Sequence, residues 1–294
     1  MLEAFLVPIL PVLFIALLGA LLSRTTTWLD NPALGQMVTN IGLPALLIHS
    51  LLNMQMDLSG MGLLILAMAS TLVLSAVVTL VVLRLCGQPI RRYLSVLVNP
   101  NTGNLGIPVV FALFGEQALA IAVVVSSVVT ISHFTLGVSV MSGSFAPRQL
   151  LRNAPALALL VAALLLGLDL QPPGFVMKTL DMVGGITLPI MLMMLGRSLA
   201  DLKFGRSTEW TPLLLMAVYR PLVGLAAAAT VVWVLGMDEL EARVLMVQAA
   251  MPVAVISYVL TLRYEGPTDR VAGLILLSIP TSFAVVGILA HFWL

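Results

Sequence analysis

Asn99-Pro-Asn-Thr-Gly-Asn-Leu-Gly-Ile-Pro108 interrupts an otherwise apolar segment of the chain. Proline removes a backbone donor and breaks a helix, and glycine and asparagine weaken it further. Backbone groups freed in this way are tolerated at membrane depth only against protein or a watery cavity. Counted from Arg91 at about 1.5 Å per residue, the stretch lies roughly 12–25 Å inward, around the bilayer midplane. We therefore expect a broken membrane-spanning helix at this place.

The composition of the chain indicates a membrane protein. Of the 294 residues, 60% are hydrophobic and 9% are charged, and the mean hydropathy is +1.11. These values lie far outside the range of soluble domains. The net charge of +1 gives no sign of a nucleic-acid partner. Cys86 is the sole cysteine, which excludes a disulfide framework and a cysteine-based metal site.

Hydrophobic segments long enough to cross a bilayer recur ten times. They are 3–23, 31–52, 60–84, 91–113, 118–141, 150–168, 174–199, 210–235, 240–262 and 270–292. Basic residues gather in the loops after odd-numbered segments, namely Arg24, Arg84, Arg91, Arg92, Arg148, Arg152, Arg197, Lys203, Arg206, Arg263 and Arg270. The loops after even-numbered segments hold only Lys178 and Arg243. Because basic loops stay in the cytoplasm, we expect both termini outside.

The second half of the chain echoes the first about 144 residues later. Pro11, Pro44 and Pro108 correspond in the same order to Pro155, Pro189 and Pro252. Each half, 1–145 and 146–294, holds five segments, so the second half enters from the opposite side. We expect an all-α protein of two inverted five-helix repeats, with paired helix breaks and with crossing broken helices at the fourth and ninth segments. Such paired breaks are typical of a secondary transporter.

The ninth segment holds the counterpart of the first break, Gln248-Ala-Ala-Met-Pro252. Where two such breaks meet, helix N-termini aim unpaired N–H groups at one point, which suits an anion such as a carboxylate. The predicted substrate-binding residues are Asn101, Thr102, Gly103, Asn104, Gly106, Pro108, Arg220, Gln248, Met251 and Pro252. In the alternative interpretation, the prolines merely kink two packed helices and the amides hydrogen-bond across them.

Lone polar residues within the segments have two interpretations each. Arg220, about 16 Å deep, either attracts the anion or caps half-helix carbonyls. His49 and His133 are either proton carriers or neutral hydrogen-bonding residues, and we favour the second role. For Asp181 we expect an ion pair with Lys178, three residues earlier, with proton coupling as the minority interpretation.

Hydroxyl groups of the fifth and tenth segments correspond in the repeat. Ser127 matches Ser278, and Thr130 matches Thr281. These side chains either line the site, coordinate sodium or simply bridge membrane helices. No cluster of carboxylates occurs within the segments, so the sequence predicts no strong sodium site.

Asn101-Thr-Gly-Asn-Leu-Gly-Ile-Pro108, followed by Leu113-Phe-Gly115, resembles the fourth-segment signature of the auxin efflux carrier family. That family includes the plant PIN-type auxin carriers and bacterial carriers of malonate and malate. Ala249-Ala-Met-Pro-Val-Ala254 resembles the ninth-segment counterpart, and Arg220-Pro221 resembles the basic residue near proline in the eighth segment. The resemblance covers essentially the whole chain.

The resemblance implies a scaffold from segments 1, 2, 6 and 7, which usually dimerises. Segments 3–5 and 8–10 would form a transport domain that moves like an elevator. Family carriers bind an organic anion at the crossover, so Asn101, Pro108 and Pro252 carry over by motif. Asn104 stands where we expect an apolar or aromatic residue in many relatives, and the added amide would favour a smaller, more polar acid.

We therefore expect a homodimeric secondary transporter of a small mono- or dicarboxylate, auxin- or malonate-like, in a bacterial cytoplasmic (inner) membrane. It would need no cofactor, no metal and no catalytic residue. An alternative is a sodium- or proton-coupled symporter or antiporter of the same plan, although Asp and Glu are absent from both breaks. An intramembrane enzyme is the third hypothesis, and no H-E-x-x-H motif, P-loop or G-x-S-x-G elbow supports it.

Overall fold

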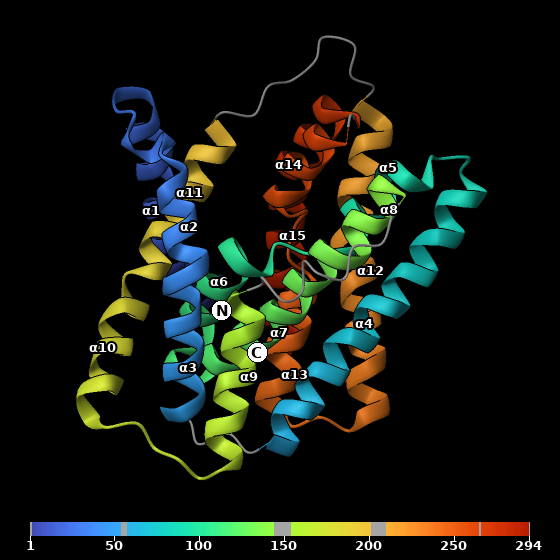
Figure 1. The fold of residues 1–294 in the computed structure, drawn as a ribbon. Helices are drawn as coiled ribbons and strands as arrows, with labels where there is room; N and C mark the ends of the chain where they lie inside the picture. Colours follow the sequence, from blue (N-terminus) through green and yellow to red (C-terminus); the bar gives the residue numbers. More distant parts are fainter. Residues whose placement is uncertain (1, 54–57, 144–153, 201–209, 265, 294) are drawn as a thin grey trace.

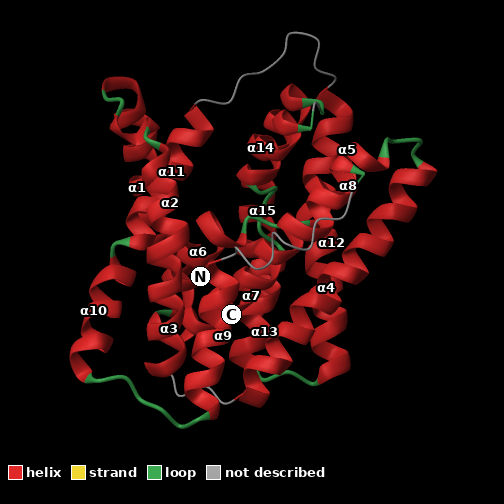
Figure 2. Cartoon of the chain, in the orientation of Figure 1, coloured by secondary structure: helices red, strands yellow, loops and turns green. Residues whose placement is uncertain are grey.

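A computed structural model describes residues 2–53, 58–143, 154–200, 210–264 and 266–293, and over these ranges the protein is helical, without β-strands (Figure 1, Figure 2). The elements are α1 (Leu2–Thr25), η1 (Trp28–Asp30), α2 (Pro32–Met37), η2 (Val38–Gly42), α3 (Leu43–Asn53), α4 (Leu58–Leu85), α5 (Ile90–Val98), η3 (Thr102–Gly106), α6 (Ile107–Phe114), η4 (Glu116–Ala118), α7 (Leu119–Ser132), η5 (His133–Gly137), α8 (Val138–Ser142), α9 (Ala154–Gly167), α10 (Gly174–Gly185), α11 (Thr187–Ala200), α12 (Trp210–Leu235), α13 (Glu239–Ala249), α14 (Val255–Arg263) and α15 (Thr268–Trp293).

Within the described residues, six helical segments are long and apolar enough to cross a membrane. They are Ala33–Asn53, Gly60–Leu85, Glu116–Ser142, Gly174–Arg197, Trp210–Leu235 and Thr268–Trp293. Shorter apolar helices cover Leu10–Thr25, Thr102–Phe114 and Leu157–Gly167. The helices support the predicted membrane character, whereas the inverted ten-segment plan stays a prediction. Arg148, Arg152, Lys203, Arg206 and the boundary at 145/146 lie outside the described residues.

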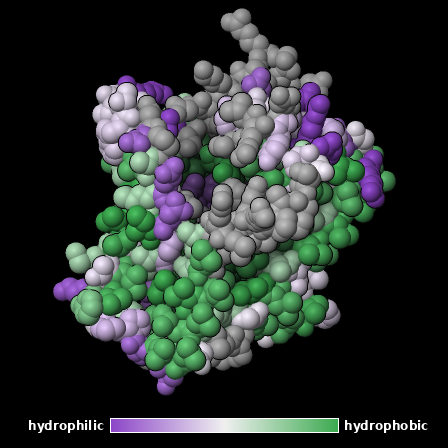
Figure 3. All heavy atoms as spheres, viewed as in Figure 1, coloured by the Kyte–Doolittle hydropathy of each residue, from purple (hydrophilic) through white to green (hydrophobic). Residues whose placement is uncertain are grey.

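Large apolar side chains on the surface fit a lipid environment. Trp233 is 83% exposed and Phe175 is 75% exposed, and many leucines and valines are exposed beside them. Among the coloured atoms of the face drawn in Figure 3, hydrophobic residues cover most of the lower half and the right side, and most hydrophilic residues lie toward the upper and lower ends. Exposed apolar surface on this scale is unfavourable in water but favourable against acyl chains.

Helix contacts divide the described helices into two groups. In the first helix group, α1 packs along α11, and α3 packs against α9 and α10. In the second helix group, α12 packs against α4, α13 and α15, α4 contacts α5 and α7, and α14 contacts α15. Figure 1 shows the first group on the left and most of the second on the right. The groups meet where α1 contacts α6, α3 contacts α7, and α11 contacts η3.

Glycines allow the closest approach within the first helix group. A Cβ atom on Gly196 of α11 would overlap the backbone carbonyl of Ala16 on α1. In the same way, a Cβ atom on Gly19 of α1 would overlap the carbonyl of Met193 on α11. Small residues bring membrane helices into backbone contact, where van der Waals packing and weak C–H···O contacts hold them.

The prolines of the predicted repeat differ in their effect on the helices. The expected break at Pro11 is wrong, because α1 runs through this residue without interruption. At Pro44 the chain stays helical but widens into the π turn η2 just before it. Pro189 follows the change from α10 to α11, and Pro155 lies at the start of α9. A helix therefore accommodates an isolated proline by a π turn or by placing it near a terminus, where fewer bonds are lost.

Candidate functional site

The two predicted helix breaks at the fourth and ninth segments are both present, and they meet. The helix stops after α5 and resumes at η3, and it stops again after α13 and resumes at α14. Pro100 and Val253 form an isolated antiparallel bridge. The backbone N–H of Asn101 donates to the carbonyl of Pro252 at 2.8 Å. Main-chain hydrogen bonding thus joins two segments about 150 residues apart in sequence.

After the first break, the helix restarts as a π turn because of Pro108. The N–H of Gly106 donates to the carbonyl of Asn101 at 2.9 Å, and that of Ile107 donates to Thr102, five residues back in each case. Pro108 has no N–H for the carbonyl four residues earlier, so the wider turn costs little here. The side chain of Asn101 does not cap the turn. The first N–H groups of η3 therefore keep their hydrogen-bonding capacity.

Asn99 holds the first break in place. Its side chain is buried, and its Nδ2 donates to the carbonyl and to the Oγ of Ser95, both at 3.2 Å. Its Oδ1 accepts a hydrogen bond from the Oγ of Ser132 on α7 at 2.8 Å. The amide thus satisfies the end of α5 and connects it to a neighbouring helix. Asn99 is not among the predicted binding residues, but the sequence did not predict this structural role, because the partner Ser132 lies 33 residues away.

Asn101 differs from Asn99 in its contacts. Its side chain is 5% exposed and makes no hydrogen bond to another described residue. Thr102 is buried, and its Oγ1 donates to the Oγ of Ser126 at 3.2 Å. Gly103 and Asn104 are partly exposed. The turn therefore combines a buried start, where an unpaired amide lies, with an accessible middle.

Gln248 fills the space between the two breaks. It is fully buried, and its Nε2 donates to the carbonyl of Ala122 at 3.3 Å. Its Oε1 has no hydrogen-bond partner, and a Cβ atom added to Gly106 would overlap it. That added Cβ would also lie 3.2 Å from Cγ of Met251. Glycine at position 106 thus permits α13 and the turn η3 to approach closely.

Arg220 caps a helix end beside the second break. The side chain is 1% exposed, and its Nη1 donates to the carbonyl of Ala249, the last residue of α13, at 3.0 Å. The capping interpretation therefore describes its contact in this conformation. The next residue, Pro221, releases the carbonyl of Ala217 four residues earlier, and Oγ1 of Thr281 donates to that carbonyl at 2.9 Å.

The hydroxyl groups of Ser278, Ser127 and Thr130 on α7 and α15 also bond to the backbone. Ser278 accepts from the N–H of Val253 at 3.0 Å and donates to the carbonyl of Ile275 at 3.0 Å. Ser127 and Thr130 donate to carbonyls four residues earlier in their own helix, each at 2.8 Å. Within the described residues these groups satisfy backbone atoms, which accords with their interpretation as structural groups in membrane helices.

Pro108 connects the break to a cavity between the two helix groups. This interface cavity has a volume of about 470 Å³. Its walls are mostly apolar, with Val12, Leu192 and Pro189 on the first helix group and Pro108 and Phe111 on the second. The structure thus brings the other predicted binding residues together at the crossing, while Pro108 also faces the interface cavity.

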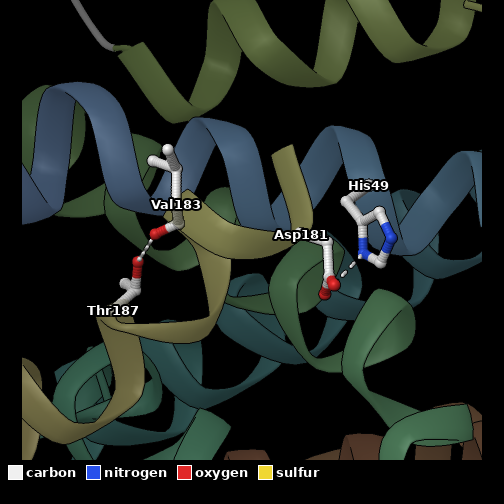
Figure 4. Close-up of polar contacts among 4 residues, drawn as sticks. All are labelled: His49, Asp181, Val183 and Thr187. Atoms are coloured by element: carbon white, nitrogen blue, oxygen red, sulfur yellow. Dashed lines mark hydrogen bonds and ion pairs between the residues drawn. The ribbon is translucent and has the colours of Figure 1, made fainter. Parts of the chain in front are cut away.

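His49, Asp181 and Glu116 are the titratable residues of the interface cavity. His49 Nδ1 lies 4.0 Å from Asp181 Oδ1, and Figure 4 shows the two side chains turned toward each other from α3 and α10. The expected ion pair between Asp181 and Lys178 does not form within 4.0 Å in the part of the chain described. Figure 4 also shows the Thr187 hydroxyl donating to the carbonyl of Val183 at 3.2 Å, where α10 gives way to α11.

His133 is buried in the second helix group, and its Nε2 has no hydrogen-bond partner in the structure. It is not among the residues that line the interface cavity. The described residues contain no group of three or more His, Cys, Asp or Glu side chains suited to a metal ion.

Comparisons with known proteins identify the family of the chain. The profile of a family described as membrane transport protein matches residues 4–149 and 138–289. An uncharacterized transporter of Methanocaldococcus jannaschii is 30% identical over 199 residues, which are 64% of this chain and 63% of that relative. The chain thus matches slightly less than two thirds of that relative's length. An uncharacterized transporter of Methanothermobacter thermautotrophicus is 27% identical over 282 residues, 92% of each chain.

Proposed function

This chain belongs to the auxin efflux carrier family of membrane transport proteins, and from that premise we propose that it carries a small organic anion, a mono- or dicarboxylate. It is an integral membrane protein of a transporter family.

The observation that carries the proposal is the uncapped helix start at the meeting point of the two breaks. The first N–H groups of η3 carry the positive end of a helix dipole. The amide of Asn101 lies beside them without a side-chain hydrogen bond. Asp and Glu are absent from both breaks, so no fixed negative charge competes there. A carboxylate can accept hydrogen bonds from the N–H groups and from the asparagine together.

The contacts of the two helix groups support an elevator mechanism. We assign the first group to the scaffold, from segments 1, 2, 6 and 7, and the second to the transport domain, from segments 3–5 and 8–10. The meeting breaks lie within the second group, while η3 contacts α11 of the first. Sliding of one group along the other would expose the bound anion to each side in turn. Inverted repeats would make the two end states nearly equivalent in energy.

The remaining parts of the proposal rest on the sequence pattern and on the family. The distribution of basic residues favours both termini outside. We place the protein in a bacterial cytoplasmic membrane. We place a homodimer contact on the scaffold, as the family resemblance implies.

Uptake into proteoliposomes tests the proposed cargo. The purified protein is reconstituted, and exchange of labelled malonate, malate and indole-3-acetate is measured, with the neutral diamide of malonate as competitor control. We expect one class of acid to exchange in a protein-dependent manner and the diamide not to compete, because the helix start recognises negative charge. Exchange that requires no carboxylate, or a thermal shift with sodium alone and with none of the acids, would contradict the proposal.

A further inference from the structure

The interface cavity carries a titratable group that the proposed anion site does not use. His49 of α3 lies on its wall with a side chain that is 16% exposed. Histidine is the side chain whose charge changes near neutral pH. A group that gains a positive charge beside the path of an anion changes how strongly the anion is held.

The strength of the interaction between His49 and Asp181 depends on whether the imidazole carries a proton. At 4.0 Å, Nδ1 and Oδ1 are too far apart for a hydrogen bond, so the neutral imidazole gains little from the carboxylate. A protonated imidazole would gain a favourable charge interaction with it. α3 packs directly against α10, and this packing brings the two side chains near each other.

Few other charges face this pair among the described side chains. Glu116 lines the cavity from the second helix group, and Lys178 shares with His49 and Asp181 a neighbouring recess at the end of α10. The residues that α1, α6 and α11 contribute to the cavity are uncharged. α9, which packs against α3, contains no charged residue in Ala154–Gly167.

With neutral His49, the charges that the described residues bring to the interface cavity are the two carboxylates Asp181 and Glu116. That arrangement repels an organic anion. A proton on His49 offsets one of the two negative charges in a cavity that Pro108 of the first break also lines. By reciprocity, an anion in the cavity then raises the affinity of His49 for a proton by the same factor.

We propose that His49, held beside Asp181 in the interface cavity, is a proton-binding site that couples proton uptake to binding of the organic anion. The inference rests on the proposed function, because it requires that the cargo be an anion. It adds a role for the first helix group, which would take up the proton while the crossing in the second group holds the carboxylate.

Calorimetric titration of the purified protein with malonate tests this coupling. The titration is repeated from pH 6 to pH 8 in two buffers that differ in their heat of ionisation, so that proton uptake is measured directly. We expect up to about one proton taken up per malonate bound, and an affinity that falls by at most about tenfold per pH unit as the pH rises. In His49→Gln, this uptake should vanish and the pH dependence should flatten.

Two further variants separate the role of His49 from general effects. His291→Gln changes an exposed histidine at the end of α15 and should retain the proton uptake of the unmodified protein. Asp181→Asn removes a carboxylate that is 62% exposed, so the fold should tolerate it, and the proton uptake that depends on this charge partner should fall. Titration of malonate itself is the same in all variants and cancels in their difference.

The outcomes distinguish this inference from the proposed function. If the unmodified protein binds acids without proton uptake, or if His49→Gln takes up protons as before, the coupling inference fails while the anion site stands. If none of the acids binds at any pH, the proposed function fails, and the inference fails with it.

Discussion

Replacing Asn101 by alanine tests the anion site most directly, because the chain offers a matched control two residues away. Asn99 and Asn101 flank Pro100 in the same break, and both are buried. The side chain of Asn99 makes three hydrogen bonds, whereas that of Asn101 makes none to the described residues. The two alanine variants should therefore differ in kind, one losing stability and the other losing affinity.

The magnitudes follow from these contacts. Asn101→Ala removes no hydrogen bond from the fold, so the free energy of unfolding should change by less than about 1 kcal/mol. If the amide donates to a carboxylate, the loss of a hydrogen bond to a charged group weakens binding by about 1.5–3 kcal/mol. At about 1.4 kcal/mol per factor of ten, the dissociation constant for the acid should rise roughly 10- to 150-fold.

Asn99→Ala should show the opposite pattern. The carbonyl of Ser95 and the hydroxyl of Ser132 lose their partner in a buried place, which costs about 1–3 kcal/mol of stability. For a protein of this size, that corresponds to a drop in Tm on the order of 2–10 °C. Because the amide of Asn99 faces α7, the folded Asn99→Ala variant should bind the acid with nearly unchanged affinity.

Thermal unfolding in detergent and titration with the acid that exchanges in proteoliposomes supply the two readouts. Asn99→Ala should lose more thermal stability than Asn101→Ala, and Asn101→Ala should lose more affinity for the acid. If Asn101→Ala melts as low as Asn99→Ala and binds the acid like the unmodified protein, the assignment of Asn101 to the ligand is refuted.

Three further predictions concern packing and orientation. Thr281→Val should destabilise the protein by about 0.6–1.7 kcal/mol. In a Pro221→Ala background the loss should be far smaller, because a new N–H donates to the Ala217 carbonyl, and equal losses in a double-mutant cycle would contradict this account. Gly196→Ala should lower Tm, because the added Cβ overlaps the Ala16 carbonyl at a cost of about 1–3 kcal/mol. The control Gly185→Ala adds a Cβ that meets no atom within 4 Å and should leave Tm unchanged, and similar melting of both variants would show that α1 and α11 adapt freely. In a Cys86→Ser background, an impermeant maleimide added to intact cells should label Asn53→Cys and spare Arg92→Cys, and the reverse pattern would invert the predicted orientation.

The sequence predicted the two helix breaks of the crossing correctly but overestimated the effect of isolated prolines. Around Pro100, asparagines and glycines accompany the proline, and the helix stops. Neither Pro11 nor Pro221 has asparagines or glycines directly beside it, and both helices continue. Local sequence does not show which distant group can satisfy a released carbonyl. The hydroxyl that does so for Pro221 comes from Thr281, sixty residues later.

The same limit explains what sequence reasoning missed among the side chains. Asn99 and Asn101 belong to one motif, and only tertiary contact with Ser132 assigns the first to the fold. The predicted pair of Lys178 with Asp181 was the nearest local partner, but His49 on α3 lies closer in space. Local spacing identifies polar groups at membrane depth; their partners depend on helix packing, which no single segment encodes.

The direction of the backbone groups at the crossing argues for an anion over a sodium ion there. Sodium would need free carbonyl oxygens, yet those of Asn101, Pro252 and Ala249 already accept hydrogen bonds. The donor to Ala249 is the guanidinium of Arg220, a positive charge that would repel a second cation. Unused donor capacity at this point lies in the N–H groups at the start of η3. Oε1 of Gln248 is an unpaired acceptor among the described residues, but it is buried against Gly106. A coupling cation should therefore bind outside the crossing. A proton bound to His49 does so, and it needs no set of carbonyl ligands.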